Sequence, residues 1–128
     1  GFLGWLIPMW CLLIHDTFIQ LILSGQKTWE VRTQKLFEAG ERIALGNTKT
    51  KLVEGYADIS EVKKLTVQEM KRHNDQHFGN DFISERWSDR DWLYAFVLAN
   101  VKRSYGYERY PRSNGSPKVR LKYPLLES

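Results

Sequence analysis

The sequence predicts a mixed α/β fold that is rich in strands: a small, partly closed β-barrel of five or six strands with two or three short helices. Two observations support this fold class. Most apolar segments are short runs that alternate with polar residues or end at turn signals, as strands do. The 128 residues also suffice for one hydrophobic core, and no linker, repeat or low-complexity tract divides them.

The N-terminal part is expected to supply the first four elements. A buried strand is predicted at residues 11–14, followed by a helix over 17–24 that Asp16 caps. Strands at 27–32 and 42–46 follow, because their apolar residues recur with period two.

The middle of the chain is expected to hold a bent strand and a short helix. The strand at 52–62 alternates unevenly and contains Gly55, which predicts a bend or bulge. Thr66 and Glu69 have the spacing of a capping box, which predicts that a short helix begins there. Residues 74–91 are polar and are expected to be irregular.

The C-terminal part is expected to complete the barrel. Residues 92–101 are nearly all apolar, which favours a central strand that is buried on both faces. Asn114-Gly115 is a strong turn signal, so a hairpin is predicted within 105–123.

The composition is that of an ordinary soluble protein, with 42% hydrophobic and 27% charged residues. Cys11 is the single cysteine, so there is no internal disulfide partner and no cysteine-based zinc cluster. Residues 1–14 are apolar but too short to span a membrane and lack a basic start. We therefore expect a cytoplasmic protein with no membrane partner. Its oligomeric state is open, with a monomer expected. Residues 1–10 are expected to be an extension or a non-native remnant, with the domain over 11–128.

The basic residues are concentrated near the C-terminal end. Residues 1–101 contain 12 basic and 13 acidic side chains, whereas residues 102–128 contain 7 basic and 2 acidic ones. This asymmetry indicates an anionic partner on one part of the surface.

One stretch, residues 24–32, is the strongest candidate for a site. Gly25 is a natural helix stop, and the alternating strand after it places Glu30 and Arg32 on the same face. Lys27 lies at the strand entrance, so two cations and one carboxylate are expected to converge there. The alternative is a solvated edge strand with a surface ion pair of little energetic value.

The order of elements and the motif resemble the ASCH domain, a family of PUA-like β-barrels. The resemblance rests on G-x-K-x-x-E-x-R at residues 25–32, the strand at 11–14, the GERI sequence at 40–43 and the YAFVL sequence at 94–98. It covers roughly residues 11–123. It implies a cleft that receives RNA or a modified nucleoside, lined by the motif's lysine, glutamate and arginine.

The resemblance also implies a possible hydrolase. One branch of the family removes the acetyl group of N4-acetylcytidine, with a threonine nucleophile three residues after the motif lysine and a glutamate that follows a histidine. Glu30 stands at the threonine position here, and His73 and His77 align with the histidine and the glutamate. Lys27 and an aromatic residue, Tyr94, are kept. Two of the three catalytic groups are thus replaced, and a ribonuclease activity is the other enzymatic alternative.

The candidate residues have chemistry that suits an anionic or base-containing ligand. Lys27 is a point charge for phosphate or carbonyl oxygen, Arg32 offers a planar fork, and Glu30 can accept from a base amino group or pair with its neighbouring cations. His73 and His77 are four residues apart and could provide acid–base function, but two histidines alone do not predict a metal. No metal and no cofactor are expected.

A second candidate surface interleaves cations with tyrosines in residues 102–112, a pattern typical of single-stranded RNA binding. The alternative is a solvated loop whose tyrosines pack on the barrel. Trp29 is added as a candidate because it adjoins the motif. The candidate RNA contacts of this surface are Arg103, Tyr105, Tyr107, Arg109 and Arg112.

Three hypotheses follow from the sequence. The first is an RNA-binding or nucleoside-binding module, which we favour. The second is a hydrolase in which Lys27 is catalytic, with Glu30 or the pair His73 and His77 providing acid–base function. The third is a protein-interaction adaptor built on the same barrel.

Overall fold

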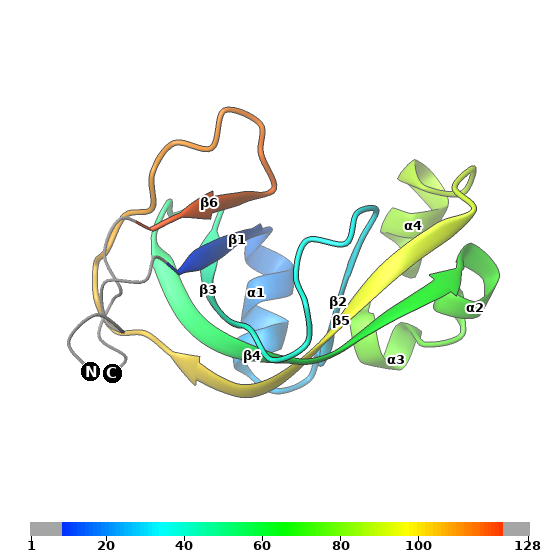
Figure 1. The fold of residues 1–128 in the computed structure, drawn as a ribbon, viewed down its shortest axis with the longest axis horizontal. Coiled ribbons are helices and arrows are strands. Elements are labelled where there is room, and N and C mark those ends of the chain that lie inside the picture. Colours follow the sequence, from blue (N-terminus) through cyan, green and yellow to red (C-terminus); the bar gives the residue numbers. More distant parts are fainter. Residues whose placement is uncertain (1–8, 122–128) are drawn as a thin grey trace.

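The computed structural model describes residues 9–121. Six strands in these residues form one sheet in the order β2-β5-β4-β3-β1-β6. The β1–β3 pair is parallel and the other neighbouring pairs are antiparallel. The sheet curls into a half-barrel, which confirms the predicted fold class (Figure 1). The elements are β1 (Trp10–Ile14), α1 (Asp16–Leu23), β2 (Trp29–Arg32), β3 (Arg42–Asn47), β4 (Val53–Thr66), α2 (Val67–Lys71), α3 (Asn74–His77), α4 (Asn80–Arg86), β5 (Trp92–Arg103) and β6 (Lys118–Arg120).

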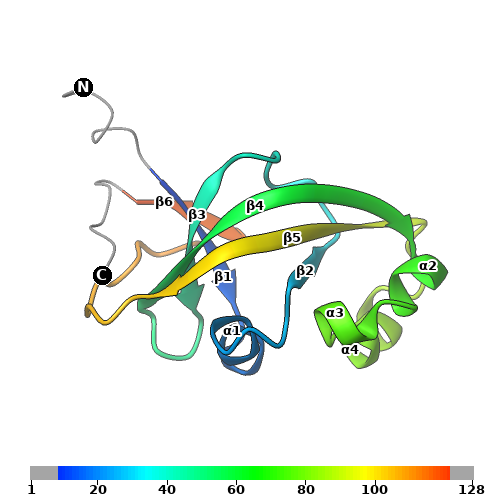
Figure 2. The same cartoon turned by 90° about the horizontal axis from the view of Figure 1, so that it is seen from below.

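Helix α1 fills the concave side of the half-barrel. Its Ile19 and Ile22 are fully buried and join a core cluster with apolar side chains from β1, β3, β4 and β5. A second cluster, which contains Met70 and Ile83, joins α2 and α4 to β2 and β5. Figure 2 shows α2, α3 and α4 gathered beyond one end of the long strands β4 and β5. A third cluster joins buried side chains of β1, β3, β4 and β6, so the described part of the sheet has three apolar clusters.

The strand β4 is long and irregularly paired, as the uneven alternation of residues 52–62 predicted, and it pairs with the similarly long β5. Their pairing shifts register between Tyr56 and Asp58 and again between Ile59 and Glu61. Gly55 lies beside a further shift, in the pairing of β4 with β3, where Leu45 pairs with Gly55 but Gly46 pairs with Val53. It also allows a close approach of the backbone. A Cβ atom added there would lie 2.8 Å from the Lys102 carbonyl oxygen and 2.7 Å from a methyl group of Leu23.

Two expectations about helices were wrong. Residues 74–91 are not irregular, because α3 and α4 form where His77 and Ile83 are buried against the sheet. Asp16 does not cap α1 but lies in its first turn, where its Oδ1 accepts a hydrogen bond of 2.7 Å from Asn47 Nδ2. The cap at Thr66 is confirmed, since its side chain accepts a 3.1 Å hydrogen bond from the Glu69 backbone N–H. The Glu69 carboxylate reaches back to the Thr66 hydroxyl, from which it accepts at 2.9 Å.

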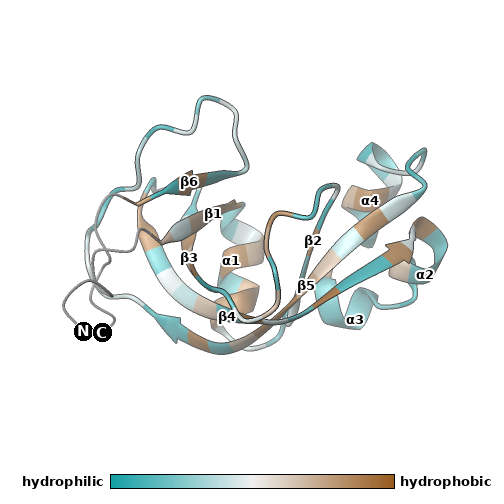
Figure 3. Cartoon of the chain, in the orientation of Figure 1, coloured by the Kyte–Doolittle hydropathy of each residue, from teal (hydrophilic) through white to brown (hydrophobic). Residues whose placement is uncertain are grey.

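The predicted C-terminal hairpin was also wrong. Asn114 and Gly115 do form a turn with positive φ angles of 53° and 88°, but β6 pairs antiparallel with β1 rather than with residues 105–112. The apolar partners decide this pairing, because Val119 is buried against Cys11 and its neighbours. Figure 3 shows that the connection from β5 to β6 is largely hydrophilic. Tyr123, predicted in the closing strand, lies outside the described residues.

Two side chains bridge the open side of the half-barrel, where no strand pairing joins β2 to β1 and β6. Arg32 Nη2 donates to the Leu13 carbonyl oxygen at 2.7 Å, and Lys118 Nζ donates to the Leu36 carbonyl oxygen at 2.7 Å. Lys118 Nζ also lies 4.1 Å from the centre of the Trp10 ring. We refer to the Arg32–Leu13 and Lys118–Leu36 hydrogen bonds as the seam bridges.

Candidate functional site

Lys27 lies at the centre of a buried group of charges at the entrance of β2, and its residue is only 3% exposed. Its ammonium contacts three acceptors: the Trp29 carbonyl oxygen at 2.7 Å, the His77 carbonyl oxygen at 2.5 Å and Glu30 Oε1 at 3.1 Å. An ammonium has three N–H groups, so all of them are engaged. Burial lowers the pKa of Lys27 and the charge of Glu30 opposes that change.

Glu30 and Arg32 form the rest of this group, with both side chains on the same face of β2 as predicted. Glu30 Oε2 accepts from Arg32 Nε at 3.0 Å and from Arg32 Nη2 at 2.7 Å. Burial alone would raise the pKa of Glu30, but the charges and hydrogen bonds of Lys27 and Arg32 outweigh it and lower that pKa. Within residues 9–121, Arg32 Nη1 donates no hydrogen bond, and Oε1 of Glu30 accepts only from Lys27. Because Lys27 and Arg32 share the single carboxylate of Glu30, the three side chains carry one net positive charge.

His77 is fully buried, and its two ring nitrogens have fixed roles. Nδ1 accepts a 2.9 Å hydrogen bond from the Gly79 backbone N–H, so Nε2 must carry the proton that is donated to the Met70 carbonyl oxygen at 2.7 Å. Burial lowers the pKa of His77, the Met70 hydrogen bond opposes the change, and the charge of Lys27 adds to it. His77 is thus a neutral side chain that positions the backbone oxygen bound by Lys27.

The neutral state of His77 predicts a pH-dependent stability. Its pKa is lower in the folded protein than the value of about 6.5 in the unfolded chain, so the unfolded state binds more protons in the interval between the two values. The free energy of unfolding should therefore fall as the pH drops below about 6.5, by at most about 1.4 kcal/mol per pH unit. Urea unfolding at pH 7.5 and 5.5 measures this change.

The variant His77→Gln is the control for this prediction, because glutamine can still donate to Met70 but does not titrate. It should lose much of the difference in stability between the two pH values. An unchanged difference would assign the pH dependence to other groups. Glu30 affects the free energy of unfolding only at lower pH, below about 4.5. There the unfolded chain takes up a proton at Glu30, whereas the folded protein does not, because folding lowers the pKa of that carboxyl.

A pocket of about 180 Å³, which we call the central pocket, opens onto this group of charges. Lys27, Glu30, Arg32 and His77 line its polar side. Aromatic rings of Phe18, Phe82 and Trp87 line other parts of its wall, and the remaining lining residues are Leu13, His15, Val31, Thr48, Gly79 and Ile83.

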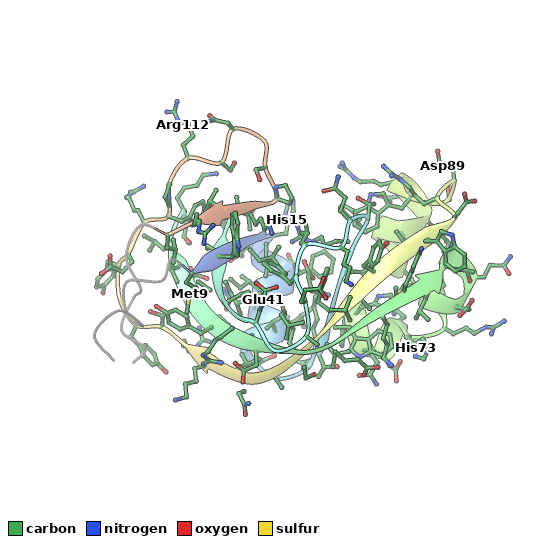
Figure 4. All side chains as sticks on the ribbon, viewed as in Figure 1. Met9, His15, Glu41, His73, Asp89 and Arg112 are labelled. Atoms are coloured by element: carbon green, nitrogen blue, oxygen red, sulfur yellow. The ribbon has the colours of Figure 1, made fainter. Side chains whose placement is uncertain are left out.

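Three of the residues predicted to act with the motif, Trp29, His73 and Tyr94, do not line the central pocket. Trp29 is buried on the other side of β2, where its ring lies 4.7 Å from that of His73 and 5.6 Å from Lys63 Nζ. Figure 4 shows His73 far from His15, which lines the central pocket. Tyr94 is half-buried and packs against the main core cluster.

A second pocket of about 430 Å³, the basic pocket, adjoins the first. Arg109 and Arg112, both predicted as RNA contacts, line it, and Figure 4 shows Arg112 on the loop that precedes β6. Its other lining residues are Leu13, Thr48, Lys51, Tyr110, Pro111 and Ser113. The predicted contacts Arg103, Tyr105 and Tyr107 are exposed and line neither pocket.

Sequence reasoning missed most of the pocket walls. Phe82 and Trp87 carried a weak signal as large apolar residues in a polar segment, but nothing in their spacing placed them in one pocket with Phe18. His15 lies directly before α1 and Thr48 directly after β3. Neither residue belongs to a sequence pattern that indicates a site.

Two further observations concern the described residues alone. Residues 9–121 contain no group of three or more His, Cys, Asp or Glu side chains placed to hold a metal ion. None of the helices found there is long and apolar enough to cross a membrane.

Comparisons with known proteins identify the fold and the family. The structure is similar to crystal structures of an ASCH protein from Zymomonas mobilis, with a TM-score of 0.77, 19% identity and coverage of 88% of this chain and 87% of that one. A tyrosine-to-phenylalanine mutant of that protein matches with the same TM-score of 0.77 and 19% identity, covering 88% and 89% of the two chains. A serine-to-alanine mutant also gives 0.77, with 20% identity and coverage of 90% and 91%. At this identity the likeness shows the fold alone.

No curated protein matched the sequence. The family model described as the ASCH domain matches residues 12–110, which is most of the chain. The chain therefore belongs to the ASCH domain family, whose fold is PUA-like and whose members are often linked to RNA binding.

Proposed function

We propose that this ASCH domain binds a single nucleobase, of RNA or of a nucleoside, in the central pocket. The observation that carries the proposal is the combination of aromatic walls with a charged floor. Phe18, Phe82 and Trp87 contribute aromatic rings to the pocket wall, and Glu30 and Arg32 offer an acceptor and donors in the same pocket. Unstacked bases are recognised by this pairing of aromatic stacking with hydrogen bonds to the base edge.

The size of the central pocket supports one ring system rather than a larger ligand. Its volume is about 180 Å³. An apolar protein cavity of roughly 150 Å³ is known to hold benzene, and sites for drug-sized ligands begin at about 300 Å³. A flat heterocycle that enters from the open side therefore matches the available space.

The free hydrogen-bonding groups favour a base with an amino group beside a ring acceptor. Oε1 of Glu30 accepts from Lys27 and has capacity for a second donor, while Arg32 Nη1 has two N–H groups that no described residue accepts. Carboxylates accept from the N4 amino group of cytosine. Cytosine, whose N4 amino donor lies beside the ring acceptor N3, complements this pair, and uracil has a carbonyl oxygen in place of that amino group.

The same geometry gives no support to the hydrolytic alternative. The Lys27 ammonium donates to three acceptors and has no lone pair for a base or nucleophile role. The ring nitrogens of His77 are both occupied by backbone groups. Binding without chemical conversion is therefore the function that these contacts favour.

Arg32→Met tests the proposal. Cytidine, N4-acetylcytidine, adenosine and uridine are titrated into the protein by calorimetry, and the indole N–H signal of Trp87 is followed by NMR. We expect an amino-bearing nucleoside to bind and to shift the Trp87 signal. Arg32→Met should weaken that binding by about tenfold or more, because base-edge hydrogen bonds discriminate by about 1–3 kcal/mol.

Arg42→Met is the matched control. Arg42 also pairs with a carboxylate, Asp58, at 2.8 Å and donates to a backbone carbonyl, that of Asn100 at 3.2 Å, but it lines neither pocket. It should leave the affinity unchanged. Absence of binding by all four nucleosides to the wild type, or binding that leaves the Trp87 signal in place, would contradict the proposal without depending on any variant.

A further inference from the structure

We infer that the basic pocket is a phosphate subsite, so that the ligand is a nucleotide whose base occupies the central pocket and whose phosphate lies among Lys51, Arg109 and Arg112. This inference rests on the proposed function and narrows its ligand class. The phosphate could belong to a free nucleoside monophosphate or to one nucleotide unit of RNA, because both present the same chemistry.

The first argument is continuity. The two pockets share Leu13 and Thr48, which form part of the wall of each. A base and its phosphate are separated by one ribose, so a nucleotide needs two adjoining sites rather than one large cavity. The shared residues are where the sugar would pass.

The second argument is charge. Lys51, Arg109 and Arg112 line the basic pocket, and no described carboxylate lines it. None of these three side chains forms an ion pair with another described residue. In the central pocket, by contrast, the one carboxylate is already matched by two cations. The basic pocket thus gathers three cations without a described carboxylate partner where a phosphate would be placed, and arginine forks bind phosphate in a bidentate manner.

The third argument is that the backbone of both cationic segments is held in place. Asn47 is fully buried, and its Oδ1 accepts from the backbone N–H groups of Lys49 at 2.8 Å and Thr50 at 3.3 Å, which fixes the turn before Lys51. Tyr110, between the two arginines, donates from its hydroxyl to the Asn47 carbonyl oxygen at 3.0 Å. Its ring lies 2.9 Å from the position of a Cβ atom on Gly46.

Backbone contacts join the same two segments. The backbone N–H of Val53 donates to the Glu108 carbonyl oxygen at 2.8 Å, and Leu52 forms an isolated antiparallel bridge with Arg109. The cations of the turn and of the loop are thus brought to one pocket by ordered backbone. A preorganised set of donors binds an anion with less loss of conformational entropy than a flexible basic tail.

The experiment compares cytidine with cytidine 5′-monophosphate, cytidine 3′-monophosphate and tetracytidylate by calorimetry at low salt of about 50 mM. One of the two monophosphates should bind about tenfold or more tightly than cytidine. The double variant Arg109→Ala/Arg112→Ala should lose that gain while its affinity for cytidine stays unchanged. The control Arg72→Ala/Arg90→Ala removes the same charge from exposed positions outside both pockets and should keep the gain.

The outcomes separate this inference from the proposed function. If cytidine binds and neither monophosphate binds more tightly, the subsite is overturned while the base pocket stands. If the gain persists in Arg109→Ala/Arg112→Ala, or disappears equally in the control variant, the subsite is also overturned. If no ligand binds, both proposals fail together. With the gain confirmed, tetracytidylate that binds more tightly than the monophosphate identifies RNA as the source of the phosphate, and equal affinities identify a free nucleotide.

Discussion

Replacement of Lys27 by methionine should lower the free energy of unfolding by about 3–5 kcal/mol, because loss of one partner leaves the other charge buried. Glu30, which is 5% exposed, would keep its ion pair with Arg32 but lose its contact with the Lys27 ammonium. The carbonyl oxygens of Trp29 and His77 would lose the same donor. Urea unfolding followed by circular dichroism measures the change.

Lys35→Met provides a matched control. Lys35 and Glu38 have the same spacing of three residues and an ion pair of 3.2 Å, but their side chains are 47% and 72% exposed. Exposed pairs contribute about 0–1 kcal/mol. Equal losses in Lys27→Met and Lys35→Met would show that burial does not determine the value of the Lys27 contacts.

Replacement of Gly55 by alanine should cost about 1–3 kcal/mol or more, the range for overpacking of a filled site. The new Cβ atom would meet the Lys102 carbonyl oxygen, which cannot rotate away as a side chain does. Strand pairing joins Tyr56 to Lys102, and Ser104 N–H donates to the Glu54 carbonyl oxygen at 2.9 Å. The strands would have to separate locally, which a lower midpoint of urea unfolding would report.

Gly106→Ala is the control for this substitution. An added Cβ atom there would lie 3.7 Å from Ser104 Oγ and 3.8 Å from Glu108, at ordinary contact distances. We expect its stability to stay within about 0.5 kcal/mol of the wild type, as for most surface substitutions. A Gly55→Ala variant as stable as Gly106→Ala would mean that β4 and β5 can move apart at this point without loss.

The sequence was sufficient to predict local features of the site. The helix stop at Gly25 and the period of two after it correctly placed Glu30 and Arg32 on one face, with Lys27 beside them. Such predictions succeed because they depend on neighbouring residues, which backbone geometry alone relates.

Features that depend on distant partners could not be predicted in this way. Lys27 binds the carbonyl oxygen of His77, fifty residues later, and any residue type could have supplied that oxygen. The C-terminal turn signal was real, but β6 chose β1 as its partner because their apolar side chains are buried together. The aromatic lining likewise comes from α1 and from α4 with the residue after it, which only tertiary packing brings to one pocket.

The seam bridges make unequal demands on the two residues that form each contact. Arg32 and Lys118 each donate to a backbone oxygen, at Leu13 and Leu36, so the acceptor survives any substitution at those two leucines. The donors have no such freedom, because reaching across the gap requires a long cationic side chain. Each contact that closes the half-barrel thus depends on the side chain of one residue and on only the backbone of the other.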